Sequence, residues 1–435
     1  MGWRLPKPFL IASAVSTVVG GIVILKDVIS GADLKLDPKL KAHGKTVIVT
    51  GSNTGIGKET ARGLAKYGAT VYMACRDLTL CEKAREEIVL DTKNSKVYCR
   101  HCDLADFDSV RKFAEEFKKE EGKLNILINN AGIMRCPRML TKQGIEMQLG
   151  VNHMGHFLLT NLLLEPLKAA APSRIVVLSS LAHTRGTINF EDLNSEKSYD
   201  PGDAYSQSKL ANVLFTKELA KRLQGTGVTV NAVHPGLVVT ELARHMDISK
   251  STMAKIFVQP IFKFVLKTPT QGSYTSLYVA LDPSLDSTTG KYFSDSAEKD
   301  TAPAAEDPET ALRLWLTSEK WTKLVYSTTS SKVAGEDERF QESNIATYLK
   351  KRTRTPCRWD FVVAVVERRG SSYGYCTSPA IVCSFCDNNS FRTTFLLHSA
   401  PPTLWHVGFI GCDVLELLRL TKYLWYLCLF AGMDF

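Results

Sequence analysis

Short β-branched segments alternate with longer helical stretches from Gly44 to about Val325, and this alternation limits the folds open to the chain. Most of the short segments are apolar on both faces, which is typical of strands covered by helices on either side. The predicted strands are Thr46–Val49, Thr70–Cys75, Val97–Cys102, Ile126–Ile128, Arg174–Leu178, Val228–Val233 and Lys291–Phe293. We therefore expect an α/β fold with a doubly wound parallel sheet, whose ligand crevice lies at the carboxyl ends of the strands.

Before this region, an apolar run of seventeen residues, Phe9–Leu25, contains no charged side chain. That length is the lower limit for a membrane span, so residues 1–40 are predicted to form an N-terminal membrane anchor and linker. Two alternatives stay open: a secretory signal cleaved near Ser30–Ala32, and a helix that is buried or lies in the membrane interface. The lysines that follow the run favour a catalytic domain on the cytosol-like side.

After Val325 the pattern changes to a Ser/Thr-rich linker, Ser327–Ser331, and then to a basic stretch around Lys350. Neither helical nor strand periodicity persists beyond it. We divide the chain into the anchor at 1–40, a central α/β domain at 41–325 and an atypical C-terminal tail at 326–435. The tail is expected to be poorly ordered, and an interaction module there is the alternative.

Charge and cysteine usage exclude several classes of protein. The net charge of +9 comes without a dense Lys/Arg block, so no nucleic-acid partner is expected and a membrane surface fits better. Eleven scattered cysteines, an odd number, indicate a reducing compartment rather than the disulfide framework of a small secreted domain. The CxxC pairs Cys99/Cys102 and Cys383/Cys386 lack a second pair at zinc spacing, so no metal site is predicted.

A glycine-rich turn follows the first predicted strand at once and opens a helix. Gly51 allows a tight turn, Gly55 lets the backbone approach a pyrophosphate, and Gly57 lets the helix pack closely on the strand. The amino terminus of that helix adds unpaired N–H groups and the positive end of its dipole. The turn therefore predicts a Rossmann-type dinucleotide site, although a glycine-rich turn without a ligand would read the same way. Its residues are Gly51, Ser52, Asn53, Thr54, Gly55, Ile56 and Gly57.

The end of the second predicted strand indicates which dinucleotide binds. A carboxylate there would bind the ribose 2′-OH of NAD, but Cys75 stands in that position and Arg76 follows it. A guanidinium matches a 2′-phosphate, so NADP(H) is the predicted cofactor. Asp77 competes with this interpretation, but it precedes the helical stretch Leu78–Val89, where an N-cap residue is expected.

Two further strand ends carry residues suited to the same cofactor. Asp103, followed by Leu104, closes the third strand and can accept a hydrogen bond from an adenine amino group, with capping of the next helix as the alternative. Small residues close the fourth strand and let a cofactor lie against the backbone. These are Ala131 and Gly132, which follow Asn130.

Tyr205 and Lys209 are four apart on a helix-compatible stretch and would share one face. A fixed positive charge stabilises a phenolate and makes tyrosine useful in proton transfer, although an exposed helical pair has the same spacing. Ser180 follows the fifth strand and can hold a substrate oxygen, while Asn152 could interrupt its helix and seat a proton-relay water. Three nearby histidines, His153, His156 and His183, lack metal-site spacing and are interpreted as structural.

In this order, the motifs resemble those of the short-chain dehydrogenases/reductases over about Lys41–Leu324. The resemblance adds Pro235, Gly236 and Thr240 to the expected cofactor contacts, together with Tyr205 and Lys209. Finer features, such as Cys75–Asp77 and Gly150–Thr160, resemble the retinol dehydrogenases of that family, and most of all their mitochondrial type.

The resemblance implies NADP(H)-dependent interconversion of retinal and retinol, with reduction favoured. Ser180 would polarise the carbonyl oxygen, Tyr205 would protonate it, and Lys209 would lower the tyrosine pKa, hold the nicotinamide ribose and pass protons through water at Asn152. The substrate would be a small apolar aldehyde or alcohol. An apolar segment between Pro235 and Gln271 could cover it, although helix packing or membrane contact would explain that segment as well.

Two other functions stay open on the sequence. The same residues suit a broader carbonyl reductase of lipid aldehydes, steroids or foreign ketones, and a cofactor-binding scaffold is a second alternative. The anchor and the resemblance together favour the mitochondrial inner membrane, with the endoplasmic reticulum membrane as the alternative. A homo-oligomer is compatible with the sequence.

Overall fold

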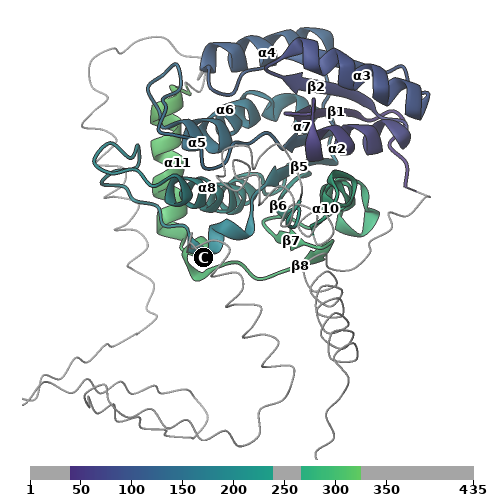
Figure 1. Cartoon of the computed structure of the whole chain (residues 1–435). Coiled ribbons are helices and arrows are strands. Elements are labelled where there is room, and N and C mark those ends of the chain that lie inside the picture. Colours follow the sequence, from purple (N-terminus) through teal and green to yellow (C-terminus); the bar gives the residue numbers. More distant parts are fainter. Residues whose placement is uncertain (1–39, 239–265, 325–435) are drawn as a thin grey trace, which may run out of the picture. The chain divides into compact units, whose positions relative to one another are not determined.

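The computed structural model describes residues 40–238 and 266–324, which are coloured in Figure 1. Eight strands form one sheet in the order β3-β2-β1-β4-β5-β6-β7-β8. They are β1 (Thr46–Thr50), β2 (Thr70–Cys75), β3 (Val97–His101), β4 (Ile126–Asn129), β5 (Ser173–Leu178), β6 (Val228–His234), β7 (Tyr292–Ser294) and β8 (Ala297–Glu298). Only the β7–β8 pair is antiparallel within this sheet. Because the chain leaves β1 toward β3 and returns to its other side at β4, the β1–β4 junction is the topological switch point.

Helices cover both faces of the sheet, as Figure 1 shows. One layer contains α2 (Gly55–Lys66), α3 (Leu78–Thr92) and α10 (Pro269–Leu281), and the other contains α4 (Phe107–Glu120), α6 (Gly155–Leu162), α8 (Pro201–Arg222) and α11 (Pro308–Thr322). The shorter elements are α5 (Met147–Leu149), the π-helix η1 (Gly150–Met154), α7 (Leu164–Ala169), and the 3₁₀ helices η2 (Leu181–Arg185), η6 (Pro283–Leu285) and η7 (Pro303–Ala305). The predicted doubly wound α/β fold is confirmed.

Burial along the strands explains why the sequence pattern predicted them. Every residue of β5 and β6 is buried, whereas β3, at the edge of the sheet, alternates between buried and exposed positions. The seven predicted strands agree with β1 to β7 to within one residue at each end. The two residues of β8 are exposed, so no apolar pattern marked them.

Aspartates begin the helices that follow β2 and β3. Asp77 caps α3, as predicted, because its carboxylate accepts a hydrogen bond from the Leu80 N–H at 2.9 Å. Asp106 caps α4 in the same way. The alternative prediction that Asp103 caps α4 is therefore wrong. Asp103 lies three residues earlier and accepts from the Ala105 N–H within the turn.

One disulfide joins Cys81 on α3 to Cys99 on β3. The cysteine spacing gave no sign of this pair, because the two residues meet only after α3 packs back along β3. Cys75, Cys102 and Cys136 are buried thiols. Within residues 40–238 and 266–324, no three His, Cys, Asp or Glu side chains gather as metal ligands.

Several predictions fall on residues outside the described part of the chain. The proposed anchor at Phe9–Leu25, the tail at 326–435, Thr240 and most of the apolar segment before Gln271 all lie there. No helix among the described residues is long and apolar enough to cross a membrane.

Candidate active site

The glycine-rich turn lies at the switch point and depends on close packing. A Cβ atom on Gly51, whose φ is +62°, would come within 2.8 Å of the Cα of Ala131. At Gly57 a Cβ would approach the Asn130 side-chain nitrogen to 2.3 Å and the Gly51 carbonyl oxygen to 2.4 Å. Gly55 has a φ of +56° at the first position of α2. Side chains at Gly51 and Gly57 would clash with these neighbours, so the turn needs glycine there, as a dinucleotide turn does.

The amino terminus of α2 is suited to an anion. Thr54 is the N-cap residue, but its side chain makes no capping hydrogen bond, and the first turn holds no acidic residue. The first N–H groups of α2 and its dipole therefore remain available to a pyrophosphate. Asn53 is half-buried beside them. These features fit the predicted dinucleotide.

Two residues of the predicted turn have structural contacts. The Ser52 hydroxyl is fully buried, donates to the Val49 carbonyl at 2.9 Å and lies 3.6 Å from the Cys75 sulfur. Ile56 packs against the core on the α10 side of the sheet. Ser52 and Ile56 therefore support the turn from its core side.

Hydrogen bonds join the end of β1 to the end of β4. The Thr50 hydroxyl oxygen accepts from the Asn130 and Ala131 N–H groups, each at 2.9 Å. The Asn130 amide donates in return to the Thr50 carbonyl at 2.7 Å and to the Gly51 carbonyl at 3.2 Å. The predicted residues Asn130 and Ala131 thus hold the glycine-rich turn in place.

The residues predicted to select the cofactor lie at the ends of β2 and β3. Arg76 is exposed directly after β2 and makes no hydrogen bond or ion pair with another described residue. Cys75 beside it is buried, which raises the pKa of its thiol. Asp103 is half-buried, and only its Oδ1 has a partner among the described residues. The Leu104 side chain is buried in the core, so only its backbone could face a cofactor.

Tyr205 and Lys209 lie in the first half of α8 and are almost completely buried, at 6% and 4% exposure. The alternative interpretation as an exposed helical pair is therefore wrong. The Lys209 Nζ lies 5.6 Å from the centroid of the Tyr205 ring and donates to the Leu178 carbonyl at 3.2 Å. Ser180, two residues beyond that carbonyl, accepts from the Ala182 N–H at 3.2 Å, and its hydroxyl acts to lower the pKa of Tyr205.

Burial controls the electrostatics of this pair. Loss of solvent raises the pKa of Tyr205 to about 12, against an opposing hydrogen bond from Ser180, and lowers the pKa of Lys209 to about 8. Lys209 was expected to lower the pKa of the tyrosine. Desolvation is instead the largest cause of the shift in the tyrosine pKa, and the Lys209 ammonium donates to the Leu178 carbonyl. Tyr205 is thus a protonated donor at neutral pH.

Asn152 lies in the π-helix η1, which is the local interruption predicted for this helix. Its amide accepts from the Ile133 N–H at 2.9 Å and donates to the Ile133 carbonyl and to the Ser208 hydroxyl. A Cβ on Gly132 would stand 3.4 Å from the Asn152 Oδ1 and 3.6 Å from the Lys209 Nζ. Gly132 therefore leaves open the space between these two side chains.

The loop after β6 rests on an ion pair with a buried lysine and a half-buried aspartate, which the sequence did not reveal. Pro235 and Gly236 follow β6, and Gly236 has a φ of +88° with the Lys267 side chain 2.8 Å from its missing Cβ. Lys267 is 3% exposed and donates to Asp295 at 2.5 Å. Lysine and aspartate 28 residues apart carry no sequence signal of pairing.

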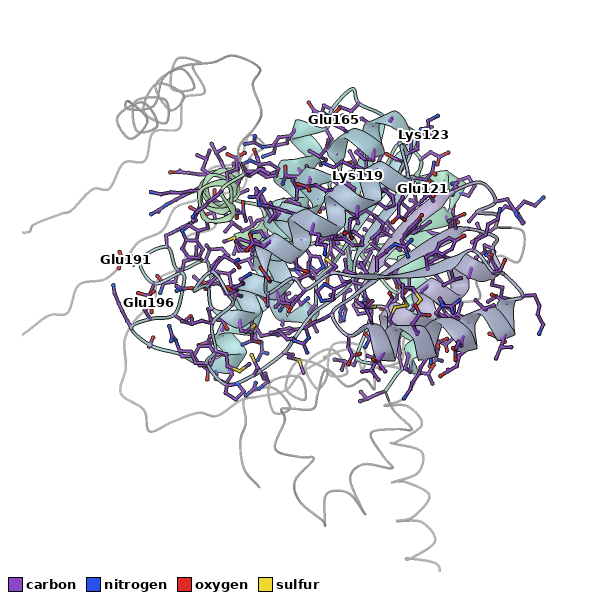
Figure 2. All side chains as sticks on the ribbon, turned by 90° about the horizontal axis from the view of Figure 1, so that it is seen from above. Lys119, Glu121, Lys123, Glu165, Glu191 and Glu196 are labelled. Atoms are coloured by element: carbon purple, nitrogen blue, oxygen red, sulfur yellow. A yellow bond between two sulfur atoms is a disulfide. The ribbon has the colours of Figure 1, made fainter. Side chains whose placement is uncertain are left out.

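A hollow lies at the opposite end of the strands, beside the amino ends of β1 and β4. It has a volume of about 530 Å³, and Glu121 and Lys123 are among its lining residues. Figure 2 shows these two side chains near Lys119 and Glu165, on a charged part of the surface. Ligand crevices of doubly wound sheets form at the carboxyl ends, so the residues around Tyr205 remain the candidate active site.

Comparison with known proteins agrees with this geometry. The short chain dehydrogenase family model matches residues 45–250. A crystal structure of an uncharacterised protein from Mycobacterium paratuberculosis superimposes with a TM-score of 0.53 and 38% identity, covering 66% of this chain and 96% of that one. The chain belongs to the short-chain dehydrogenase family and is an oxidoreductase of that family.

Its relatives place it in the retinol dehydrogenase group. Human retinol dehydrogenase 13 is 53% identical over 307 residues, which cover 70% of this chain and 92% of the relative. Human retinol dehydrogenase 12 is 56% identical over 272 residues, or 62% of this chain and 84% of the relative. Human retinol dehydrogenase 14 is 48% identical, covering 65% and 87%.

Proposed function

We propose that this protein is an NADP(H)-dependent oxidoreductase that interconverts retinal and retinol, with reduction favoured. The observation that carries the proposal is the group formed by buried Tyr205 and Lys209 with half-buried Ser180, next to the open space at Gly132. The names of its relatives, retinol dehydrogenases 12, 13 and 14, supply the substrate class.

In this reaction, side chains of the protein would donate the proton and stabilise the phenolate that remains. A bound nicotinamide dinucleotide would supply the hydride. The Ser180 hydroxyl donates a hydrogen bond to the carbonyl oxygen of the aldehyde, and the Tyr205 phenol transfers its proton to that oxygen as negative charge develops there. Lys209, with a pKa of about 8, is a cation at neutral pH and stabilises the phenolate that this transfer leaves.

The Tyr205→Phe variant tests the mechanism. We expect the turnover number for NADPH-dependent reduction of retinal to fall by at least about 100-fold, because the proton donor is lost. NADPH affinity, measured by fluorescence titration, should stay close to that of the parent. Tyr278→Phe on α10, which packs against Phe293 away from this group, is the control for losing a phenol hydroxyl. Equal turnover in Tyr205→Phe and parent would refute the role of Tyr205.

Substrate choice separates the proposal from its main alternative, a broad carbonyl reductase. Ser180 and Tyr205 contact only the oxygen that all aldehydes and ketones share, so they do not discriminate among substrates. Retinal, a lipid aldehyde and a steroid ketone should compete in one assay with NADPH. Retinal should have the highest kcat/KM, and a higher value for either competitor would favour the alternative. No turnover of any substrate by a protein that binds NADPH would favour the scaffold.

We also propose that the enzyme is anchored in the mitochondrial inner membrane through Phe9–Leu25. The apolar run has basic flanks, and no acidic residue precedes Asp27. Fractionation of cells that express the full chain should recover the protein with inner-membrane markers. Recovery with markers of the endoplasmic reticulum would overturn this placement.

A further inference from the structure

His156 occupies the first turn of α6, directly after the π-helix, and is 1% exposed. Both ring nitrogens have partners in the candidate site. Nδ1 lies 3.0 Å from the Asn152 carbonyl oxygen, and Nε2 lies 2.9 Å from the Thr50 hydroxyl. One imidazole thus connects the helix of Asn152 to the end of β1.

The chemistry of these partners assigns the proton on the ring. A carbonyl oxygen only accepts, so Nδ1 carries the hydrogen and Nε2 accepts from the Thr50 hydroxyl. The Thr50 oxygen in turn accepts from the Asn130 and Ala131 N–H groups. The Ile128 carbonyl is a second acceptor for that hydroxyl but lies farther away, at 3.4 Å.

These bonds form one continuous chain. It runs from the N–H groups at the end of β4, through Thr50 and His156, to the carbonyl of Asn152. The neutral ring is favoured because burial, with a smaller contribution from Lys209, lowers the pKa of His156 to about 4, while its bond to Asn152 opposes this.

We propose that His156 is a positioning residue that sets the π-helix of Asn152 in register with the dinucleotide turn at the β1–β4 junction. Asn152 in turn holds Ile133 and borders the space that Gly132 leaves beside Lys209. The inference rests on the proposed function, because the register matters only if a dinucleotide and a carbonyl substrate meet there.

His153 provides a matched control from the same stretch of chain. It is as deeply buried as His156, but its Nε2 pairs with the Ser318 hydroxyl on α11, and its Nδ1 has no hydrogen-bond partner among the described residues. Its ring packs against Phe157 and Phe215. His153 therefore supports the helical layer without touching the dinucleotide turn.

Two substitutions of His156 separate its two bonds. In His156→Asn the shorter amide takes the place of Nδ1 and keeps a donor for the Asn152 carbonyl, whereas in His156→Gln the longer amide takes the place of Nε2 and keeps an acceptor for Thr50. We expect His156→Asn to raise the Kd for NADPH by about threefold to tenfold, since the turn loses its support. His156→Gln should instead lower kcat by about the same factor, with the Kd for NADPH within about twofold of the parent.

Thr50→Val and Thr50→Ser complete the experiment. Thr50→Val removes the hydroxyl and should raise the Kd for NADPH. Thr50→Ser keeps the hydroxyl, so its Kd for NADPH should stay close to that of the parent. Thr50→Val removes the contact with His156 and also the acceptor for the Asn130 and Ala131 N–H groups, so adding His156→Asn to it should raise the Kd for NADPH little further. His153→Gln should lower the melting temperature while leaving Kd and kcat near the parent values.

The inference fails if the His156 variants only lower the melting temperature, as His153→Gln does, with Kd and kcat within about twofold of the parent. It fails as well if the effects of Thr50→Val and His156→Asn on Kd simply add. A parent protein that binds NADPH but reduces no retinal would refute the proposed function instead. The coupling between Thr50 and His156 would still be measured through Kd in that case.

Discussion

At the scale of single residues, the buried Lys209 makes stability depend on pH. Its pKa is about 8 in the folded protein and 10.5 without burial, so between these values the unfolded chain binds more protons. The free energy of unfolding should therefore rise with pH across that window, relative to a Lys209→Met variant. Chemical denaturation of both proteins at several pH values measures the difference. A constant difference between them would contradict the burial of a titrating lysine.

Tyr205 acts in the opposite direction at higher pH. Its pKa is raised from 10.0 to about 12, so the folded protein keeps a proton that the unfolded chain has lost. This contribution falls as pH rises above about 10. Together, Lys209 and Tyr205 should contribute most to the free energy of unfolding near pH 10.

Cofactor choice is also decided by single residues. If Arg76 receives the 2′-phosphate, charge-assisted hydrogen bonds should favour NADPH over NADH by about one to two decades. Cys75→Asp combined with Arg76→Ser should reverse this preference, because the carboxylate would accept from the 2′-OH and repel the phosphate. Kd values for both cofactors in both proteins test this.

The buried position of Cys75 complicates that design. A carboxylate there replaces a thiol that is 1% exposed and adjacent to Ser52, so some loss of stability is expected without NADH. Arg76→Ser alone is the control, since Arg76 is exposed and its loss should weaken NADPH without affecting stability. If the ratio of the Kd values for NADH and NADPH is the same in both variants as in the parent, Arg76 faces only solvent.

Some site residues could be recognised in the sequence and others could not. Tyr205, Lys209 and Ser180 were identifiable because their spacing or strand position has a chemical reason. The burial of Tyr205 and Lys209, which raises the pKa of the tyrosine, depends on the layers packed around α8. The Lys267–Asp295 pair depends on the return of the chain to β7 and has no local pattern.

At the scale of elements, the β1–α2 turn tolerates no side chain at Gly57. A Gly57→Ala methyl would stand 2.3 Å from the Asn130 side chain and 2.4 Å from the Gly51 carbonyl. We expect NADPH binding to weaken by at least about tenfold and the melting temperature to fall, because the turn must open. Gly122→Ala is the control, since nothing lies within 4 Å of its added methyl. Unchanged NADPH binding in Gly57→Ala would contradict the assignment of this turn.

Strands were predictable because burial on both faces leaves a continuous apolar run, as in β5 and β6. Asp103 and Asp106 both precede α4, and only the local geometry decides that Asp106 caps it. The π-helix η1 was expected only as an unspecified interruption at Asn152.

At the scale of the whole molecule, the described domain begins its sheet at Thr46, well after the apolar run. Deleting Met1–Leu25 should release the enzyme from membranes without unfolding it. Carbonate washing of membranes that contain the full or shortened chain, with a melting curve of the released protein, tests both points. A shortened chain that still sediments with washed membranes would point to another membrane contact.

The overall architecture followed from the sequence because alternation of strands and helices leaves few parallel topologies. The pairing of Cys81 with Cys99 did not, since it depends on how α3 lies on β3. Substrate choice depends on side chains around the reacting oxygen, and the fold leaves these free to vary.

The state of the cysteines makes this domain convenient for chemical labelling. Cys81 and Cys99 are joined to each other, and Cys75, Cys102 and Cys136 are buried, so none of the five offers an accessible thiol. The other six cysteines all follow residue 326. A maleimide dye that reacts with the folded, unreduced protein therefore reports on the C-terminal tail alone, and no cysteine of the sheet domain needs to be replaced first.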